Sequence, residues 1–124
     1  MRALLTAEPT VPAVREALRD LAVASEGKAH RTYAVLGELT DAAEQDLMDL
    51  GRFLVRLDIT ALVVVGPAGP VHAGAVLEGS WGQESRHVPD AAGALALLTD
   101  ELSADDVVLV AGLPTVLTAL EGAA

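Results

Sequence analysis

The chain has 124 residues, no cysteine and a formal net charge of −10 at pH 7. This length suits one domain, residues 1–124, with a core of its own, and the missing cysteine excludes disulfides, thiolate metal ligands and cysteine nucleophiles. An acidic surface repels phosphate backbones, so no nucleic-acid partner is expected. No stretch approaches the roughly 18 apolar residues of a membrane helix, and the N-terminal segment lacks an apolar signal core. We therefore expect a cytoplasmic protein without a membrane partner.

The N-terminal half of the chain predicts two helices around one strand. Residues 11–24 read as a helix because Pro12 stands at an early helical position and an apolar stripe follows it. A strand is expected at 32–36. Asp41, with a glutamate three residues later, resembles a capping box that opens a long helix over 41–57.

Three short runs along the chain are apolar at every position and stop at a glycine. They are residues 33–37, 61–66 and 107–112. A strand without alternation is buried on both faces, as happens when helices cover both sides of a parallel sheet. Glycine at the carboxyl end lets the chain turn sharply and leaves room for a ligand, and ligands of open α/β sheets bind at that edge.

The whole pattern alternates strands with helices, and short connections join them. Such an order predicts an α/β fold, a single Rossmann-like domain of three layers, with right-handed crossovers. We expect a mostly parallel sheet of four to six strands with helices on both faces. The remaining predicted elements are strands at 60–65, 85–88 and 106–111, helices at 71–78 and 91–102, the latter capped by Asp90, and a terminal helix from Pro114.

Phosphate-binding signatures are missing from the loops that follow the strands. The segment 66–69 is neither G-x-G-x-x-G nor a P-loop. Pro67 and Pro70 lack the N–H groups that would hold an anion. Because glycines end the strands, the aspartate of a receiver-type phosphoacceptor is missing as well.

Loops at the carboxyl ends of the predicted strands should line one face. Their acids and two histidines suit a cationic amine or a metal ion better than a phosphate, although no local metal motif such as H-x-x-x-H exists and no metal ligand or catalytic residue is assigned. The alternative is an edge that is solvated or buried against another protein. The candidate ligand-binding residues are Glu38, Asp41, His72, His87 and Asp90.

Two other features are assigned structural or contact roles. Trp81 is expected to cover the edge of the core or to anchor a partner protein, and Asp105-Asp106 is expected to form a turn.

An ordered set of segments resembles the C-terminal domain of the Mur ligases. The resemblance covers nearly the whole chain, and no single motif carries it alone. The segments are Val35-Leu-Gly-Glu38, 50–58, Leu62-Val-Val-Val-Gly66, His72-Ala-Gly-Ala75, 78–85, Val88-Pro-Asp90 and 106–110.

The resemblance implies a role in amide-bond formation on a peptidoglycan precursor. In that family a P-loop domain binds Mg-ATP, an acyl phosphate forms, and the last domain closes over the nucleotide and helps present the incoming amine. Three family motifs are replaced here. Residues 3–10 keep little of a segment like Asp-Ala-Tyr-Asn-Ala-Asn-Pro-Asp, and Leu47 stands where the family has a histidine. Residues 111–115 stand where the family has a turn like Lys-x-Ser-Arg. The chain alone is therefore expected to be inactive and to hold no cofactor.

Two classes of function follow. The chain is either one domain of an ATP-dependent Mur-type ligase, or a free-standing, non-catalytic binding module that kept the fold and lost the site. Met1 directly before the domain favours the second class, and the resemblance favours the first. The expected partner is a ligase-like or other cytoplasmic protein, and the oligomeric state stays open.

Overall fold

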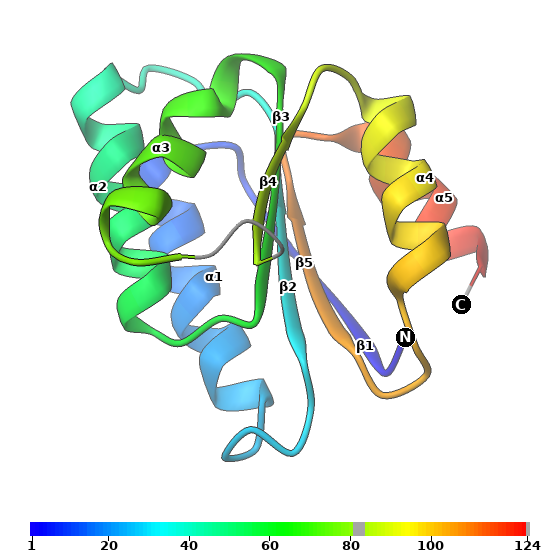
Figure 1. Cartoon of the computed structure of the whole chain (residues 1–124). Coiled ribbons are helices and arrows are strands. Elements are labelled where there is room, and N and C mark those ends of the chain that lie inside the picture. Colours follow the sequence, from blue (N-terminus) through cyan, green and yellow to red (C-terminus); the bar gives the residue numbers. More distant parts are fainter. Residues whose placement is uncertain (81–83, 124) are drawn as a thin grey trace.

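Strands and helices alternate along the chain in a computed structural model that describes residues 1–80 and 84–123 (Figure 1). The described residues form one sheet of five parallel strands in the order β1-β5-β2-β3-β4. This confirms the predicted parallel α/β fold. Trp81 lies outside the described residues. The strands are β1 (Ala3–Ala7), β2 (Thr32–Leu36), β3 (Ala61–Val65), β4 (Ser85–Val88) and β5 (Val107–Ala111).

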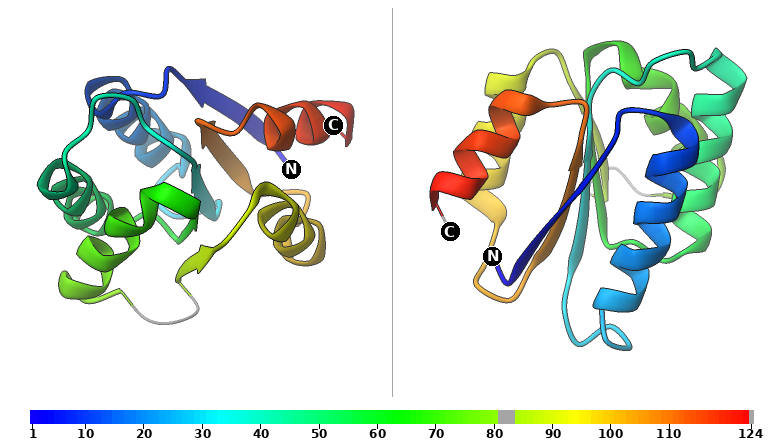
Figure 2. Two further views of the ribbon diagram at one scale, coloured as in Figure 1. Left: turned by 90° about the horizontal axis from the view of Figure 1, so that it is seen from above. Right: turned by 180° about the vertical axis from the view of Figure 1, so that it is seen from behind.

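Helices cover both faces of the sheet, so the domain has three layers (Figure 2). Helices α1 (Val11–Ala24), α2 (Glu44–Arg56) and α3 (Gly69–Leu77) pack on one face, where apolar side chains of these helices and of the sheet form the larger core cluster. Helices α4 (Ala91–Glu101) and α5 (Pro114–Ala123) cover the other face. Every residue of β2, β3 and β5 is buried, as their unbroken apolar sequences predict.

The edge strand β1 is absent from the sequence prediction. It pairs with β5 from Ala3↔Val107 to Ala7↔Ala111. Ala3 and Thr6 are exposed, and the other positions are only half-buried. An edge strand has one free side, so its sequence needs no continuous apolar run, and the pattern used to find the central strands misses it.

The start of α2 differs from the predicted capping box. The helix begins at Glu44, and Asp41 lies outside it with a positive φ of 53°. The reciprocal contact comes from Asp46, whose carboxylate accepts the backbone N–H of Ala43 at 3.3 Å. Asp41 therefore belongs to the loop after β2. In α4, by contrast, Asp90 caps the helix as predicted, accepting the Gly93 N–H at 2.8 Å.

Ion pairs tie the helices and the amino ends of the strands together. Asp106, predicted to be part of a turn, is only 1% exposed and accepts two hydrogen bonds from the half-exposed guanidinium of Arg31. The Arg86 guanidinium pairs with both carboxylate oxygens of Glu101, which also accepts the Tyr33 hydroxyl at 3.2 Å. These contacts join α4 and the loop before β5 to the strands β2 and β4.

No helix among residues 1–80 and 84–123 is long and apolar enough to cross a bilayer.

Candidate functional site

The carboxyl edge of the sheet separates the five predicted site residues into two groups. His72, His87 and Asp90 lie at the ends of β3 and β4, where α3 and α4 begin. Glu38 and Asp41 follow β2, on the side of the edge that faces the start of α1. The five residues predicted to form one site thus lie in two separate groups along one edge.

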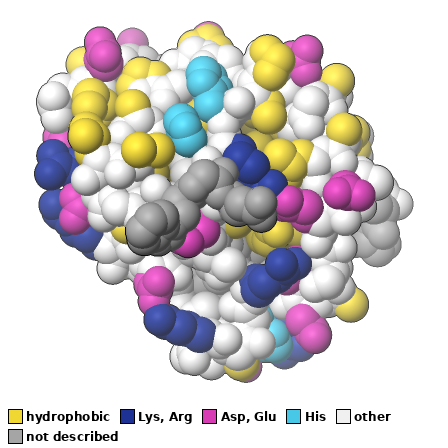
Figure 3. Space-filling model, in the orientation of Figure 1, with side chains coloured by type: hydrophobic (Ala, Val, Ile, Leu, Met, Phe, Trp, Pro, Cys, Tyr) yellow, Lys and Arg dark blue, Asp and Glu magenta, His cyan; other side chains and the backbone are white. Residues whose placement is uncertain are grey.

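The histidine group is held by hydrogen bonds that sequence reasoning did not foresee. His72 Nδ1 lies 2.6 Å from the Oγ of Ser85, a buried residue in the first position of β4. His87 Nε2 lies 2.9 Å from the carbonyl oxygen of Gly66 at the end of β3. The two ring centroids are 6.2 Å apart, and Figure 3 shows two neighbouring histidine side chains on the same face.

Each histidine of the pair meets a different environment. Burial lowers the pKa of His72 below its usual value, and the nearby charge of His87 lowers it further. His72 is therefore mostly neutral near pH 7, with one nitrogen available as an acceptor. His87 is exposed. Both side chains line a hollow of about 500 Å³ together with apolar side chains, among them Val76, Val88 and Leu97.

The acidic group lies beside a second hollow, of about 430 Å³, between the loops after β1 and β2. Thr40 joins these loops because its backbone N–H donates to the Pro9 carbonyl at 2.7 Å. Asp41 and Asp46 line this hollow, whereas Glu38 is exposed beside the turn after β5. Carboxylates gathered in this way attract cations and repel phosphates.

The turn after β5 carries apolar side chains where the family resemblance implies donors. Gly112 has a φ of 71°, and Leu113 is 8% exposed and packs in the core cluster beneath α5. Pro114 begins α5 and supplies no N–H. Ala7, Ala111, Leu113 and other largely apolar residues line a shallow hollow of about 190 Å³ there.

Lys and Arg are missing from the loops of this edge, and Arg86, which lines the hollow beside the histidines, is paired with Glu101. The chain has eight Lys and Arg residues, all within the described ranges, and none lies in the segments 37–46, 66–72, 87–93 or 111–115. A phosphate bound at these loops would find backbone N–H groups but no cationic side chain from the loops themselves. Within residues 1–80 and 84–123, no three His, Asp or Glu side chains gather closely enough to form a metal-binding cluster.

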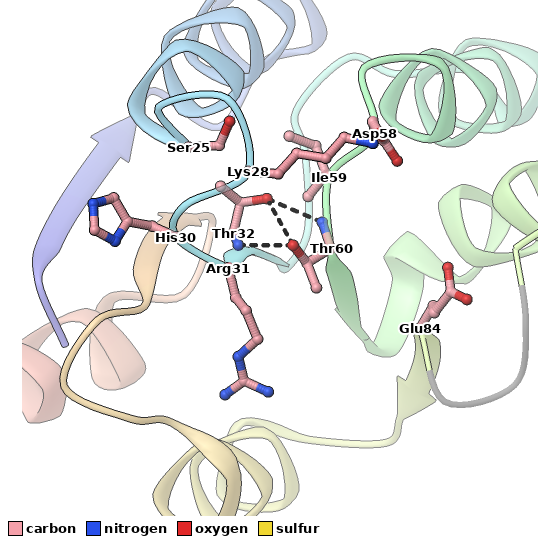
Figure 4. A pocket seen from close by; sticks show the side chains of 9 residues that line it. All are labelled: Ser25, Lys28, His30, Arg31, Thr32, Asp58, Ile59, Thr60 and Glu84. Carbon is pink, nitrogen blue, oxygen red and sulfur yellow. Dashed lines mark hydrogen bonds and ion pairs between the residues drawn. The ribbon is translucent and has the colours of Figure 1, made fainter.

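A polar hollow of about 450 Å³ lies at the opposite, amino edge of the sheet (Figure 4). Four of its polar residues pair with one another: each of Thr32 and Thr60 donates its backbone N–H to the other's hydroxyl oxygen at 3.0 Å, and Lys28 pairs with Asp58. These contacts join the loops before β2 and β3. Their donors and acceptors are used internally, which indicates a structural role.

Comparison with known proteins assigns the domain. Residues 10–113 match the model of the family described as "Mur ligase, glutamate ligase domain". The chain belongs to this family. Membership of this family explains both the fold and the order of the segments that carry the sequence resemblance.

Two mycobacterial ligases of the same name are similar to the chain. The UDP-N-acetylmuramoyl-tripeptide–D-alanyl-D-alanine ligase of Mycobacterium leprae (strain TN) is 47% identical over 88 residues, 66% of this chain and 17% of that protein. The ligase of the same name from Mycobacterium tuberculosis (strain ATCC 25618 / H37Rv) is 42% identical over 112 residues, 73% of this chain and 22% of that protein. The chain spans about a fifth of the length of the curated relatives it matches.

A solved structure shows the same fold. It is described as a domain from a UDP-N-acetylmuramate:L-alanyl-gamma-D-glutamyl-meso-diaminopimelate ligase of Haemophilus ducreyi 35000HP. The TM-score is 0.56 at 16% identity, and the match covers 88% of this chain and 82% of that one. At this identity the likeness concerns the arrangement of strands and helices.

Proposed function

We propose that this domain serves an ATP-dependent amide ligase that joins D-alanyl-D-alanine to UDP-N-acetylmuramoyl-tripeptide. The observation that carries the proposal is the 42–47% identity to mycobacterial ligases of that activity. The domain is one part of such an enzyme, because the sequence holds no P-loop. Its carboxyl edge, where open α/β sheets bind ligands, is the face that would close over the reacting groups.

The charges of this edge indicate which substrate group this domain would contact in such a ligase. Carboxylates such as Glu38 and Asp41 attract the ammonium group of an incoming amine. They do not stabilise the phosphates of Mg-ATP, which need cations or a P-loop. In this proposal another domain holds the nucleotide and its magnesium ion, and this domain lines the part of the cleft that receives the incoming amine.

The apolar turn after β5 favours a second candidate, a non-catalytic interaction module. Ala111 and Leu113 stand where the family resemblance implies a cation and a hydroxyl group, and both are buried. Since these positions offer no cation or hydroxyl group, the turn is unsuited to phosphate chemistry, and the remaining role for this edge is contact with another protein. Both candidates share the fold and differ in whether ligase turnover survives.

Domain replacement distinguishes the two candidates. We expect the M. tuberculosis ligase, with its matching segment exchanged for this chain, to release phosphate in a reaction that requires both UDP-N-acetylmuramoyl-tripeptide and D-alanyl-D-alanine. Its kcat/KM should stay within about a hundred-fold of the parent enzyme, or roughly 3 kcal/mol of transition-state stabilisation. A folded chimaera without substrate-dependent turnover favours the interaction module. As a control, the same chimaera carrying Ala111→Lys and Leu113→Ser restores the implied donors, and recovery of turnover would trace a loss to that turn.

We also expect the isolated chain not to bind Mg-ATP tightly. The absence of a P-loop and of cations along the carboxyl edge leaves the triphosphate without a partner of opposite charge. Isothermal titration calorimetry at low ionic strength should therefore show no dissociation constant below about 10 μM, or roughly −7 kcal/mol. Tighter binding would show that backbone N–H groups at this edge suffice to hold a nucleotide.

A further inference from the structure

His72 and His87 are separated in sequence but lie side by side at the carboxyl ends of β3 and β4. We propose that these two histidines bind a divalent transition-metal ion of the zinc and nickel class. The site would lie at the hollow that both side chains line beside α3 and β4. This inference concerns the chain's own side chains and does not depend on the ligase role.

The hydrogen bonds of each ring leave one nitrogen free to bind a metal. His72 Nδ1 lies 2.6 Å from Ser85 Oγ, and in the tautomer that donates Nδ1–H to this hydroxyl oxygen, Nε2 is the acceptor nitrogen. His87 Nε2–H donates to the Gly66 carbonyl, which can only accept, and in the neutral ring this leaves Nδ1 as the acceptor nitrogen. Histidines that bind metals in proteins are held in this way, with the second nitrogen hydrogen-bonded to an oxygen that fixes the tautomer and the ring orientation.

The spacing of the rings is close to what one shared ion requires. Metal–nitrogen bonds of about 2.0–2.1 Å to two imidazoles at a tetrahedral angle place the ring centroids roughly 5 Å apart. The observed separation is 6.2 Å. His87 is exposed, and its ring lies over Gly69, where a Cβ would come within 2.9 Å of the His87 Cε1. An exposed ring over a glycine can make this adjustment by rotation of its side chain.

The charges around the hollow do not oppose a cation. Arg86 also lines it, but its guanidinium is paired with both carboxylate oxygens of Glu101. Neutral imidazole is the form that binds metal. No carboxylate of the described residues joins the two imidazoles in a metal-binding cluster. Two imidazoles select borderline ions such as Zn²⁺ and Ni²⁺ over Mg²⁺, which prefers oxygen ligands, and water would complete the coordination.

The test is titration of the chain with ZnCl₂ and, separately, NiCl₂ at pH 7.5, followed by calorimetry and by histidine ring signals in NMR. We expect saturable binding with a Kd below about 1 mM, with the His72 and His87 ring signals shifted first. His87→Ala, which removes an exposed side chain, should weaken binding at least ten-fold. His72→Ala should do the same, whereas His30→Ala at the opposite edge should leave the affinity unchanged.

Two further measurements separate a histidine site from general attraction to an acidic protein. A large excess of MgCl₂ should not displace Zn²⁺, whereas it would empty a site made of carboxylates. Gly69→Ala keeps both histidines but crowds the His87 ring, so it should weaken binding while the fold is retained. The proposal is overturned by no saturable Zn²⁺ or Ni²⁺ binding to the wild-type chain, or by unchanged affinity in the His72→Ala/His87→Ala double variant.

Discussion

Replacing Gly51 or Gly74 by alanine is expected to lower the free energy of unfolding by about 2–3 kcal/mol, the range of overpacked cores. The two glycines lie where α2 and α3 cross without side chains between them. A Cβ on Gly51 would overlap the Val71 carbonyl oxygen and lie 2.8 Å from the Ala75 backbone nitrogen. A Cβ on Gly74 would overlap the Met48 carbonyl group. Since these neighbours are helix backbone, relief requires the two helices to move apart.

Urea denaturation followed by circular dichroism measures this effect. The matched control is Gly122→Ala in α5, where an added Cβ meets no atom within 4 Å. There the higher helix propensity of alanine should leave stability unchanged or raise it by up to about 1 kcal/mol. Gly51→Ala and Gly74→Ala variants as stable as Gly122→Ala would contradict the close helix contact.

Burial on both faces made the central sheet predictable from sequence. β2, β3 and β5 are apolar at every position, and only strands of a covered parallel sheet need that pattern. β1 escaped prediction because an edge strand is held by backbone hydrogen bonds to β5 while two of its side chains are exposed. The start of α2 was misplaced because Asp41 and Asp46 both fit a capping role by residue type. The left-handed backbone of Asp41 decides between them.

The site residues were predictable as types but not as an arrangement. Topology alone brings His72 and His87 to one end of the sheet, and the structure places them together. It also separates them from Glu38 and Asp41, because β2 and β4 lie on opposite sides of β3. Ser85, which orients His72, gave no signal in the sequence, since a serine opening a strand is common at turns.

The ion pair between Arg31 and Asp106 could have been predicted from the sequence, because residues of opposite charge stand directly before two buried strands. Arg31 precedes β2 and Asp106 precedes β5, and these strands are neighbours in register from Thr32↔Val107. Parallel neighbours bring the residues before them together at one edge. Asp106 accepts hydrogen bonds from Arg31 Nε at 2.9 Å, from Arg31 Nη2 at 2.7 Å and from the Ser103 backbone N–H at 2.8 Å. The pair therefore fixes how the two central strands begin.

Asp106→Asn is expected to lower the free energy of unfolding at pH 7 by about 2 kcal/mol, the range of hydrogen bonds to charged groups. Arg31 is half-exposed and regains water, which keeps the loss below that of a fully buried pair. Burial raises the pKa of Asp106, but the hydrogen bonds from Arg31 and Ser103 outweigh it, so the pKa lies below the usual value. A lowered pKa means that the stabilisation is present above about pH 4, the value for an unfolded aspartate, and is lost as the pH falls through the folded pKa.

Urea titrations at pH 7 and pH 3 should show the difference between wild type and Asp106→Asn shrinking at the lower pH. Asp105→Asn, at an exposed neighbour, is the control and should change stability by less than about 0.5 kcal/mol, and a pH-independent Asp106 effect would assign the loss to packing instead of charge.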